Sequence, residues 1–288
     1  MKTPKFSVLI ANYNNAHFIR ETLDSVFAQT YPHWEIIIAD DASTDDIRPV
    51  LNEYAADERI KIYYRDQNLG CGATKHEAAM HATGDILAYL DPEDTLRPDA
   101  LEIMVKAYRE NPGAVLVYSL HYQCDADLRV TGVNRSFGAI PPGANNFTAD
   151  KISHFAAFKK SAYLQAGGIN PQLQRAVDKD LYFKLEEAGD VVFVEEALYY
   201  YRIHPQGISS YANRDKARAW KIRVLSEAFE RRKSHLSEAE KVQYQNIIRA
   251  EIKKYHKGRM RAALRGLSPA DLWRGAVGYL QETRPPTA

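Results

Sequence analysis

The chain contains the stretch Ile86-Leu87-Ala88-Tyr89-Leu90-Asp91-Pro92-Glu93-Asp94, in which an apolar run of strand length ends in three carboxylates and a proline. A continuous apolar run bounded by turn signals is typical of a strand buried on both faces, as in a parallel sheet. Open α/β sheets bind ligands at the carboxyl ends of their strands, where carboxylates often hold Mg²⁺ or Mn²⁺. The alternative is a polar turn that caps a helix near Pro98, and the stretch alone leaves both interpretations open.

Three further strand-like runs precede this stretch, and each is followed by polar residues and then by a helical pattern. The runs cover residues 6–11, 34–39 and 60–64. Strands that alternate with helices indicate βαβ units and a parallel sheet, whose right-handed crossovers bring the strand ends to one edge. We therefore predict an α/β fold in which Asn12, Asp41, Gly70 and Asp91 lie close together.

Composition narrows the class of protein. The 288 residues are 45% hydrophobic and 26% charged, with a formal net charge of +1, which is ordinary for a soluble domain and gives no general attraction to nucleic acid. Two cysteines, Cys71 and Cys124, suit a reducing compartment and exclude a disulfide scaffold. Without a signal-peptide pattern or an apolar run of about 18 residues, we expect a cytoplasmic protein, with peripheral attachment to the inner face of a membrane left open.

The second half of the chain changes character near residue 213. Before it, we predict a strand over 114–118, a hairpin and loop over 120–150, and strands over 191–194 and 198–203. After it, glycine and proline become rare, and two long helices are predicted with a break near residues 234–237, followed by a short helix from residue 268. We therefore divide the chain into a catalytic-type domain, 1–212, and a helical C-terminal extension, 213–288.

The basic stretch over residues 253–261 in this extension has two interpretations. It is either a solvated helix face or a surface that contacts a membrane or a partner protein. No sequence signal indicates an oligomeric state.

Several motifs resemble those of family 2 glycosyltransferases, inverting enzymes of the GT-A fold. The resemblance covers about residues 5–210. Within the family, the chain looks most like the domains of bacterial polysaccharide and chondroitin-type polymerases. The motifs are Ser7-Val8-Leu9-Ile10-Ala11-Asn12-Tyr13-Asn14, Asp40-Asp41-Ala42-Ser43-Thr44-Asp45, Asn68-Leu69-Gly70, Leu90-Asp91-Pro92-Glu93-Asp94 and Ala176-Val177-Asp178-Lys179-Asp180-Leu181. The resemblance implies a Rossmann-like, mostly parallel central sheet flanked by helices. It also implies transfer of a sugar from a nucleotide donor, a UDP-sugar, to a hydroxyl of a glycan or lipid-linked acceptor.

The resemblance also implies a divalent metal, Mn²⁺ or Mg²⁺, on the diphosphate leaving group, because the charge there grows as the sugar bond breaks. Glu93 takes the third position of the family's Asp-x-Asp motif, where the metal ligand is an aspartate. Asp91 would support the metal or the ribose, and His204 resembles the family's late metal-binding histidine. The alternative for His204 is a loop histidine with a structural hydrogen bond.

A carboxylate must accept the proton of the attacking hydroxyl, and an inverting enzyme needs one such base and no covalent nucleophile. Asp178 takes the family's base position, although Val177 replaces the glutamate that usually precedes the base. The alternative for Asp178 is an N-cap at the start of a helix. By the same resemblance, His154 and Asp180 are expected on the acceptor or donor-sugar side, with Asp180 as a structural neighbour of the base.

For the nucleotide, the resemblance implies one further group of residues with separate roles. Asp41 would accept a hydrogen bond from the uracil imide, Tyr13 would stack on the base, and Lys75, where the family often has arginine, would face the base or diphosphate. The group consists of Ala11, through its backbone, Tyr13, Asp41, Gly70, Lys75 and Asp91. The alternative for Gly70 is a glycine needed only for entry into a helix.

Three other classes of protein are alternatives to a glycosyltransferase. A sugar-1-phosphate nucleotidyltransferase would need a glycine-rich, basic loop after the first strand, and a dinucleotide dehydrogenase would need Gly-x-Gly-x-x-Gly there. The sequence has Asn12-Tyr13-Asn14-Asn15 at that place. A non-catalytic scaffold on a decayed transferase fold would account for Glu93 and Val177, but not for the joint presence of Asp91, Asp178 and His204.

Overall fold

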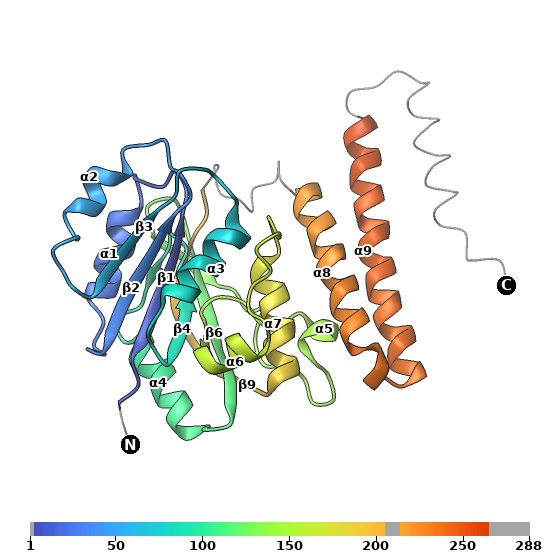
Figure 1. The fold of residues 1–288 in the computed structure, drawn as a ribbon. Coiled ribbons are helices and arrows are strands. Elements are labelled where there is room, and N and C mark those ends of the chain that lie inside the picture. The colour runs from blue at the N-terminus through green and yellow to red at the C-terminus, as the bar shows by residue number, and fades with distance from the viewer. Residues whose placement is uncertain (1–2, 205–213, 265–288) are drawn as a thin grey trace. The chain divides into compact units, whose positions relative to one another are not determined.

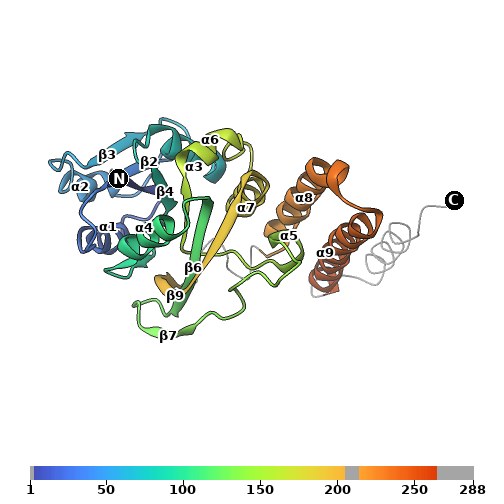
Figure 2. The same cartoon turned by 90° about the horizontal axis from the view of Figure 1, so that it is seen from below.

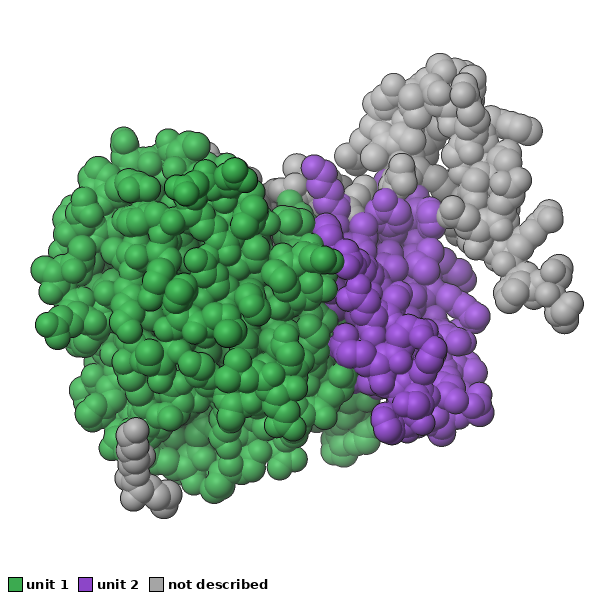
Figure 3. All heavy atoms as spheres, in the orientation of Figure 1, with its two compact units in different colours: residues 1–207 green, residues 208–288 purple. Residues whose placement is uncertain are grey.

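The computed structural model describes residues 3–204 and 214–264. The chain divides into two compact units, Met1–Gly207 and Ile208–Ala288, which Figure 3 shows in green and purple. The predicted boundary at residues 212 and 213 lies outside the described residues, as does the predicted short helix from residue 268.

The first half of unit 1 alternates strands and helices as predicted (Figure 1). Its elements are β1 (Phe6–Asn12), α1 (Ile19–Phe27), β2 (Trp34–Asp40), α2 (Ile47–Asn52), β3 (Ile60–Tyr64), α3 (Cys71–His81) and β4 (Ile86–Tyr89). Strand β1 pairs in parallel with both β2 and β4, and β2 pairs in parallel with β3. The chain therefore leaves β1 in one direction to form β2 and β3, and returns to its other side with β4. Such a reversal of strand order opens a ligand-binding crevice at the carboxyl ends of the two strands.

The later strands make the sheet mixed. The elements are β5 (Thr95–Leu96), α4 (Ala100–Glu110), β6 (Ala114–Cys124), β7 (Val130–Val133), α5 (Asn146–Ala149), β8 (Ala156–Lys159), α6 (Lys160–Gln165), α7 (Val177–Ala188) and β9 (Asp190–Arg202). Strand β8 lies antiparallel between β4 and β6, while β9 runs parallel to β6, which gives the order β3-β2-β1-β4-β8-β6-β9-β5. The predicted α/β class is confirmed, and the pairing is parallel among β1 to β4 and between β6 and β9.

One prediction of strand boundaries was wrong. The two strands expected over 191–194 and 198–203 form the single strand β9. The exposed pair Glu195 and Glu196 suggested a break, but the backbone passes through it with irregular register against β6 near Ser119 and Leu120. A bulge accommodates polar residues in a strand without ending it.

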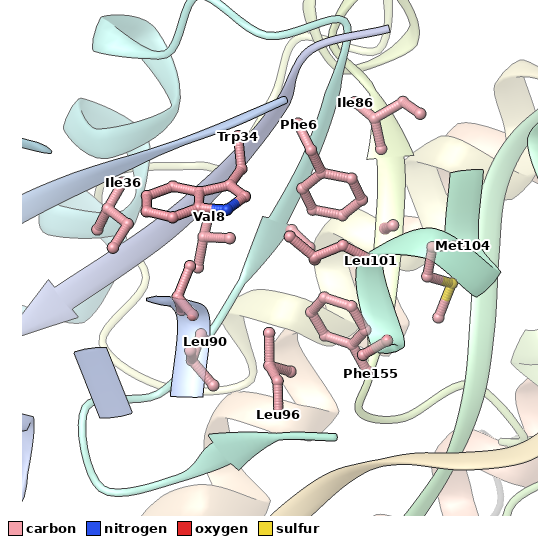
Figure 4. Packing of buried hydrophobic residues seen from close by; sticks show 14 of the residues in the cluster. Phe6, Val8, Trp34, Ile36, Ile86, Leu90, Leu96, Leu101, Met104 and Phe155 are labelled. Atoms are coloured by element: carbon pink, nitrogen blue, oxygen red, sulfur yellow. The ribbon is translucent and has the colours of Figure 1, made fainter. Parts of the chain in front are cut away.

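The largest hydrophobic core lies between the sheet and the helices on one of its faces. Figure 2 shows α1 and α4 on this side and α3, α6 and α7 on the other. Alternate side chains of β1, β2 and β4 point into this core, because successive residues of a strand face opposite sides of the sheet. Figure 4 shows them beside residues of α4 and the loops; the labelled members are Phe6, Val8, Trp34, Ile36, Ile86, Leu90, Leu96, Leu101, Met104 and Phe155. This packing fixes the strand ends that carry the polar residues.

The described part of unit 2, residues 214–264, forms two long helices, as predicted. Helices α8 (Arg214–Arg232) and α9 (Glu238–Leu264) are joined by a short 3₁₀ turn (Lys233–His235), so the break falls where the sequence placed it. Ser237 caps α9 through hydrogen bonds with Glu240. The basic stretch over 253–261 lies within α9. Among the described residues, no helix has the length and apolar composition required to span a membrane.

Candidate active site

A buried lysine joins the end of β4 to the start of α7. Lys75 on α3 donates a hydrogen bond from Nζ to Asp178 Oδ1 at 2.8 Å, and its Nζ lies 3.4 Å from Asp91 Oδ1. Its side chain is 6% exposed, while the two carboxylates are partly open to solvent. The structure thus brings together three of the predicted site residues, which are far apart in sequence.

The charges in this group are mutually stabilising. Burial disfavours the ammonium of Lys75, but Asp178 and then Asp91 outweigh that effect and raise the pKa of Lys75 well above its ordinary value. Burial of Asp91 is likewise outweighed by Lys75 and then His154, which lower the pKa of Asp91. Asp178 is in the first turn of α7, where the helix dipole favours a carboxylate. The helix begins after Ala176, so Asp178 is not its N-cap.

Glu93, in the loop between β4 and β5, lies close to His204, two residues beyond the end of β9. His204 Nε2 lies 3.8 Å from Glu93 Oε1, is buried, and has no hydrogen-bond partner among the described residues. Burial and then the positive charge of Arg202 lower the pKa of His204, which favours the neutral imidazole that binds metals. The structural alternative for His204, a satisfied loop histidine, is therefore not supported by its described neighbours.

The carboxylates of this loop are poorly compensated. Burial, and then the charge of Asp91, raises the pKa of Glu93 to about 7, and the same two causes raise the pKa of Asp94 well above its ordinary value. A divalent cation would supply the missing positive charge. Residues 3–204 and 214–264 contain no cluster of three or more His, Cys, Asp or Glu side chains arranged as a metal site. Glu93 and His204 are thus two donors that could hold a cation only together with ligand oxygens from outside the described residues, such as phosphate and water.

Asp41 is buried and holds the loop before α3. Its Oδ1 accepts hydrogen bonds from Leu69 N at 2.9 Å and Arg65 at 3.2 Å, and its Oδ2 accepts one from Gly70 N at 2.7 Å. Gly70 has φ of 91°, and a Cβ there would meet the side chain of Gln174. The conformation of the loop is thus sufficient reason for glycine at this position.

The loop after β1 lies beside Asp40 and Ser43. Ser43 Oγ accepts a hydrogen bond from Asn14 N at 2.9 Å and donates one to Asp40 Oδ1 at 2.5 Å. Ala11 is half-buried within β1, and the ring of Tyr13 is 46% exposed just beyond it. Tyr13 is therefore an aromatic surface open to a planar ligand.

His154 and Asp180 have different surroundings. The ring centroid of His154 lies 5.1 Å from that of Tyr199 and 5.8 Å from that of Tyr201, in stacked geometry, and His154 contributes to lowering the pKa of Asp91. Asp180 is buried and pairs with Lys184 at 2.7 Å on its own helix. His154 is thus linked to the group around Asp91. The ion pair of Asp180 with Lys184 does not reach that group.

Sequence reasoning missed three residues that hold this site in place. Tyr199 donates to Asp94 Oδ2 at 2.7 Å and accepts from Asp91 N at 3.2 Å, while Arg65 joins Asp41 to Glu77 on α3. Asp94 stood in the quoted stretch but was given no role. Tyr199 is one of three consecutive tyrosines and Arg65 follows a strand, so no spacing distinguished them.

Comparison with known sequences gives a family. The profile of the family described as glycosyl transferase family 2 matches residues 7–166. An uncharacterised protein of Sinorhizobium fredii is 31% identical over 222 residues, and a chondroitin synthase of Escherichia coli is 27% identical over 209 residues. A hyaluronan synthase of Pasteurella multocida is 29% identical over 217 residues. These matches cover 74%, 72% and 72% of this chain but only 24%, 30% and 21% of those relatives, respectively.

Solved structures show the same fold. S. aureus TarS 1–349 in complex with UDP-GlcNAc aligns with a TM-score of 0.71 at 16% identity, over 97% of this chain and 82% of that one. The mannosyltransferase PcManGT from Pyrobaculum calidifontis in complex with GDP-Man and Mn²⁺ aligns with a TM-score of 0.61 at 17% identity, over 99% and 82%. At this identity the likeness shows the fold alone, which is GT-A. With the family profile covering more than half of the chain, the protein belongs to glycosyl transferase family 2 and is a glycosyltransferase.

Proposed function

We propose that this chain transfers a sugar from a UDP-sugar to a hydroxyl of a glycan or lipid-linked acceptor in polysaccharide biosynthesis. The transfer inverts the anomeric centre, and Asp178 is the general base. We assign the chemistry to residues 1–212, which contain every residue named in the site, and regard 213–288 as an appended helical extension.

The observation that carries this proposal is the position of Lys75 between Asp178 and Asp91, at 2.8 and 3.4 Å. A single displacement needs the base on the acceptor side and positive charge on the diphosphate side of one sugar. Lys75 pairs with Asp178, on the acceptor side, and with Asp91, on the diphosphate side. It thereby holds the proposed base in place and provides an ammonium for the diphosphate.

The residues that would hold a divalent metal are Glu93 and His204, supported by Asp91. The Nε2 of His204, 3.8 Å from Glu93 and without a hydrogen-bond partner among the described residues, supports this assignment. A bound Mn²⁺ or Mg²⁺ supplies positive charge that stabilises the diphosphate as a leaving group. Glutamate has a longer side chain than the family's aspartate, and its carboxylate still reaches His204.

For the nucleotide, we assign Tyr13 to stacking on uracil and Asp41 to its imide N–H. Each carboxylate oxygen of Asp41 has two acceptor sites, so the described hydrogen bonds leave room for one more donor. The Ala11 backbone and Gly70 border the same loops. The choice of UDP is supported by TarS, whose structures contain UDP and UDP-GlcNAc.

For the acceptor, the relatives named as chondroitin and hyaluronan synthases support a growing polysaccharide. We place the acceptor or donor sugar beside His154, whose half-buried ring continues a stack with Tyr199 and Tyr201. Asp180, two residues after the base on α7, pairs with Lys184 and is assigned a structural place beside Asp178.

The test is a thermal-shift series with UDP, GDP, dTDP and ADP, each with and without Mn²⁺. A ligand that binds only the native state raises its stability by RT ln(1 + [L]/Kd), so a Mn²⁺-dependent shift with UDP alone is expected. UDP-sugars are then screened for UDP release. If none of the four nucleotides shifts the transition, the scaffold interpretation replaces the catalytic one.

A further inference from the structure

We propose that Arg202 is a positioning residue for the metal ligands Glu93 and His204. This inference rests on the proposed function, in which those two side chains hold a divalent cation. Arg202 itself does not contact the cation in this proposal. It fixes the two chain segments that carry the ligands, and through them the distance between Glu93 Oε1 and His204 Nε2.

The guanidinium of Arg202 is buried at the centre of three segments. Its side chain is 2% exposed. It donates from Nε to the carbonyl oxygen of Glu93 at 2.7 Å, from Nη1 to the carbonyl oxygen of Ala126 at 2.6 Å, and from Nη2 to Glu21 Oε2 at 2.7 Å. The loop after β4, the turn between β6 and β7, and helix α1 are therefore joined by one side chain.

The backbone of Arg202 is held as firmly as its side chain. Its N–H donates to Asp94 Oδ1 at 2.7 Å, and Tyr199 donates to Asp94 Oδ2 at 2.7 Å. Arg202 thus restrains the segment around Glu93 at two points. Its side chain donates to the carbonyl oxygen of Glu93, and its backbone N–H donates to the side chain of Asp94. These contacts restrain the backbone from which the Glu93 carboxylate projects.

His204 lies two residues after Arg202, and a single ring links the two side chains. The Phe18 ring lies 4.7 Å from the guanidinium carbon of Arg202 and 5.0 Å from the ring of His204. This arrangement fixes the imidazole while leaving Nε2 without a described partner. Groups that orient metal ligands in this way set the geometry of a site without binding the metal.

Arginine is required here because its three acceptors lie in different directions. A planar guanidinium has five N–H donors in a rigid fork, whereas a lysine ammonium is a point charge on a flexible chain. Arg202→Lys keeps the charge and loses the fixed fork. Arg202→Gln loses both the charge and the fork. Glu21→Gln weakens only the hydrogen bond between Arg202 Nη2 and the half-exposed Glu21 on α1.

The experiment measures Mn²⁺ binding directly on the full chain. The loss of the free aqueous Mn²⁺ signal in electron paramagnetic resonance, at saturating UDP, gives the Kd of Mn²⁺, and calorimetry in EDTA gives the Kd of UDP without metal. Arg202→Lys is expected to raise the Mn²⁺ Kd about tenfold, the lower end of losses caused by outer-shell changes, and to leave the metal-free UDP Kd unchanged. Glu21→Gln is expected to give a smaller rise, and Arg202→Gln a larger one.

A matched control is available in Arg97, which also binds three partners: Asp99, Glu196 and the carbonyl oxygen of Ala197. Arg97→Gln should lower thermal stability without changing the Mn²⁺ Kd. A double-mutant cycle with His204→Ala tests whether Arg202 acts through His204. The rise in the Mn²⁺ Kd caused by Arg202→Lys should be smaller in the His204→Ala background, because the effects of interacting residues are not additive.

The outcomes separate two failures. If wild-type protein shows no UDP-linked Mn²⁺ binding, the proposed metal-dependent function fails. If wild-type protein binds Mn²⁺ and Arg202→Lys and Glu21→Gln bind it equally well, the positioning role of Arg202 is overturned, whether or not Arg202→Gln folds. Losses that add fully in the cycle overturn the part of the proposal that runs through His204, because Arg202 would then act on Glu93 alone.

Discussion

Two glutamates lie at opposite ends of the central strands, Glu35 fully buried and Glu93 partly buried, and the pKa values of their carboxylates are shifted in opposite directions. Glu35 lies near the start of β2, and its side chain is 1% exposed. It accepts hydrogen bonds from Lys5 Nζ at 2.7 Å, Ser7 Oγ at 2.7 Å, and Thr83 N and Oγ1 at 2.5 and 2.8 Å. It thereby joins the starts of β1, β2 and β4. Glu93, after the end of β4, lies 3.8 Å from His204 Nε2, which has no hydrogen-bond partner in the described part of the chain.

The pKa values show what this difference means. Burial raises the pKa of Glu35, but the hydrogen bonds from Lys5, Ser7 and Thr83 outweigh it and lower the pKa to about 2. Burial and Asp91 raise the pKa of Glu93 to about 7. A buried carboxylate surrounded by donors serves the fold, whereas one left short of positive charge is ready to bind a cation. The sheet thus has a structural edge and a chemical edge.

The largest expected effect is at the chemical edge. Asp178→Asn keeps an oxygen for Lys75 but removes the base, so we expect transfer to fall by about 10²- to 10⁴-fold while UDP affinity is nearly unchanged. UDP release from an accepted UDP-sugar, together with calorimetry of UDP binding, measures both. Full activity in this variant would sink the assignment of the base.

Glu35→Gln is the matched change at the structural edge. All four partners of Glu35 are donors, so an amide NH₂ would face donors and leave them unsatisfied. The pKa of Glu35 falls from 4.5 to about 2 on folding, which corresponds to about 3 kcal/mol of stability at neutral pH. We expect the free energy of unfolding to drop by about that amount in urea titrations at pH 7, with activity of the remaining folded protein retained.

The sign of the pH dependence sharpens this prediction. Because the folded pKa of Glu35 is lowered, its contribution is fully present above pH 4.5 and is lost as the pH falls toward 2. The difference in unfolding free energy between wild type and Glu35→Gln should therefore shrink from pH 5 toward pH 2. A difference that is independent of pH would mean that the charge of Glu35 does not stabilise the fold.

Loss of the carboxylate at Glu93 should act on metal-dependent binding. Glu93→Ala removes a proposed ligand, so we expect the Kd of UDP in Mn²⁺ to rise by about a hundredfold, the upper end of what outer-shell changes cause. In EDTA, wild type and variant should bind UDP with the same Kd. Calorimetry in Mn²⁺ and in EDTA measures the Kd of UDP for both proteins. If wild-type protein bound UDP equally well with and without metal, the proposed role of Glu93 as a metal ligand would be wrong.

The fold was largely predictable because its signals are local. Apolar runs such as Ile36-Ile37-Ile38 and the helical spacing of Ile19, Leu23 and Val26 follow directly from burial on a sheet and on one helix face. The antiparallel strand β8 was not predicted as such, because the direction in which a strand enters a sheet depends on long-range pairing. Strand β9 was divided in two because a bulge and a turn look alike in sequence.

The site was predictable only in part, for a related reason. The carboxylates Asp91 and Asp178 follow apolar or helical patterns and so stand out in sequence. The links between them do not: nothing near Lys75 shows that it reaches residue 178, 103 positions away. Arg202 also ends a strand like many other arginines, and its three acceptors come from distant segments. Such contacts are products of the tertiary fold.

The smallest expected effects come from two serines, one at each edge. Ser7 Oγ donates to Glu35 and accepts from Gly84 N at 2.9 Å, so Ser7→Ala leaves a buried N–H unpaired and should cost about 1–2 kcal/mol of unfolding free energy. Ser43 holds the loop that carries Tyr13 through Asn14 N and Asp40. Ser43→Ala should therefore weaken UDP binding by a few-fold, on the order of one neutral hydrogen bond, with a smaller change in stability. Urea unfolding and UDP calorimetry on both variants give the comparison. If Ser7→Ala instead weakened UDP binding while Ser43→Ala affected only stability, the division of the sheet into a structural and a chemical edge would be wrong.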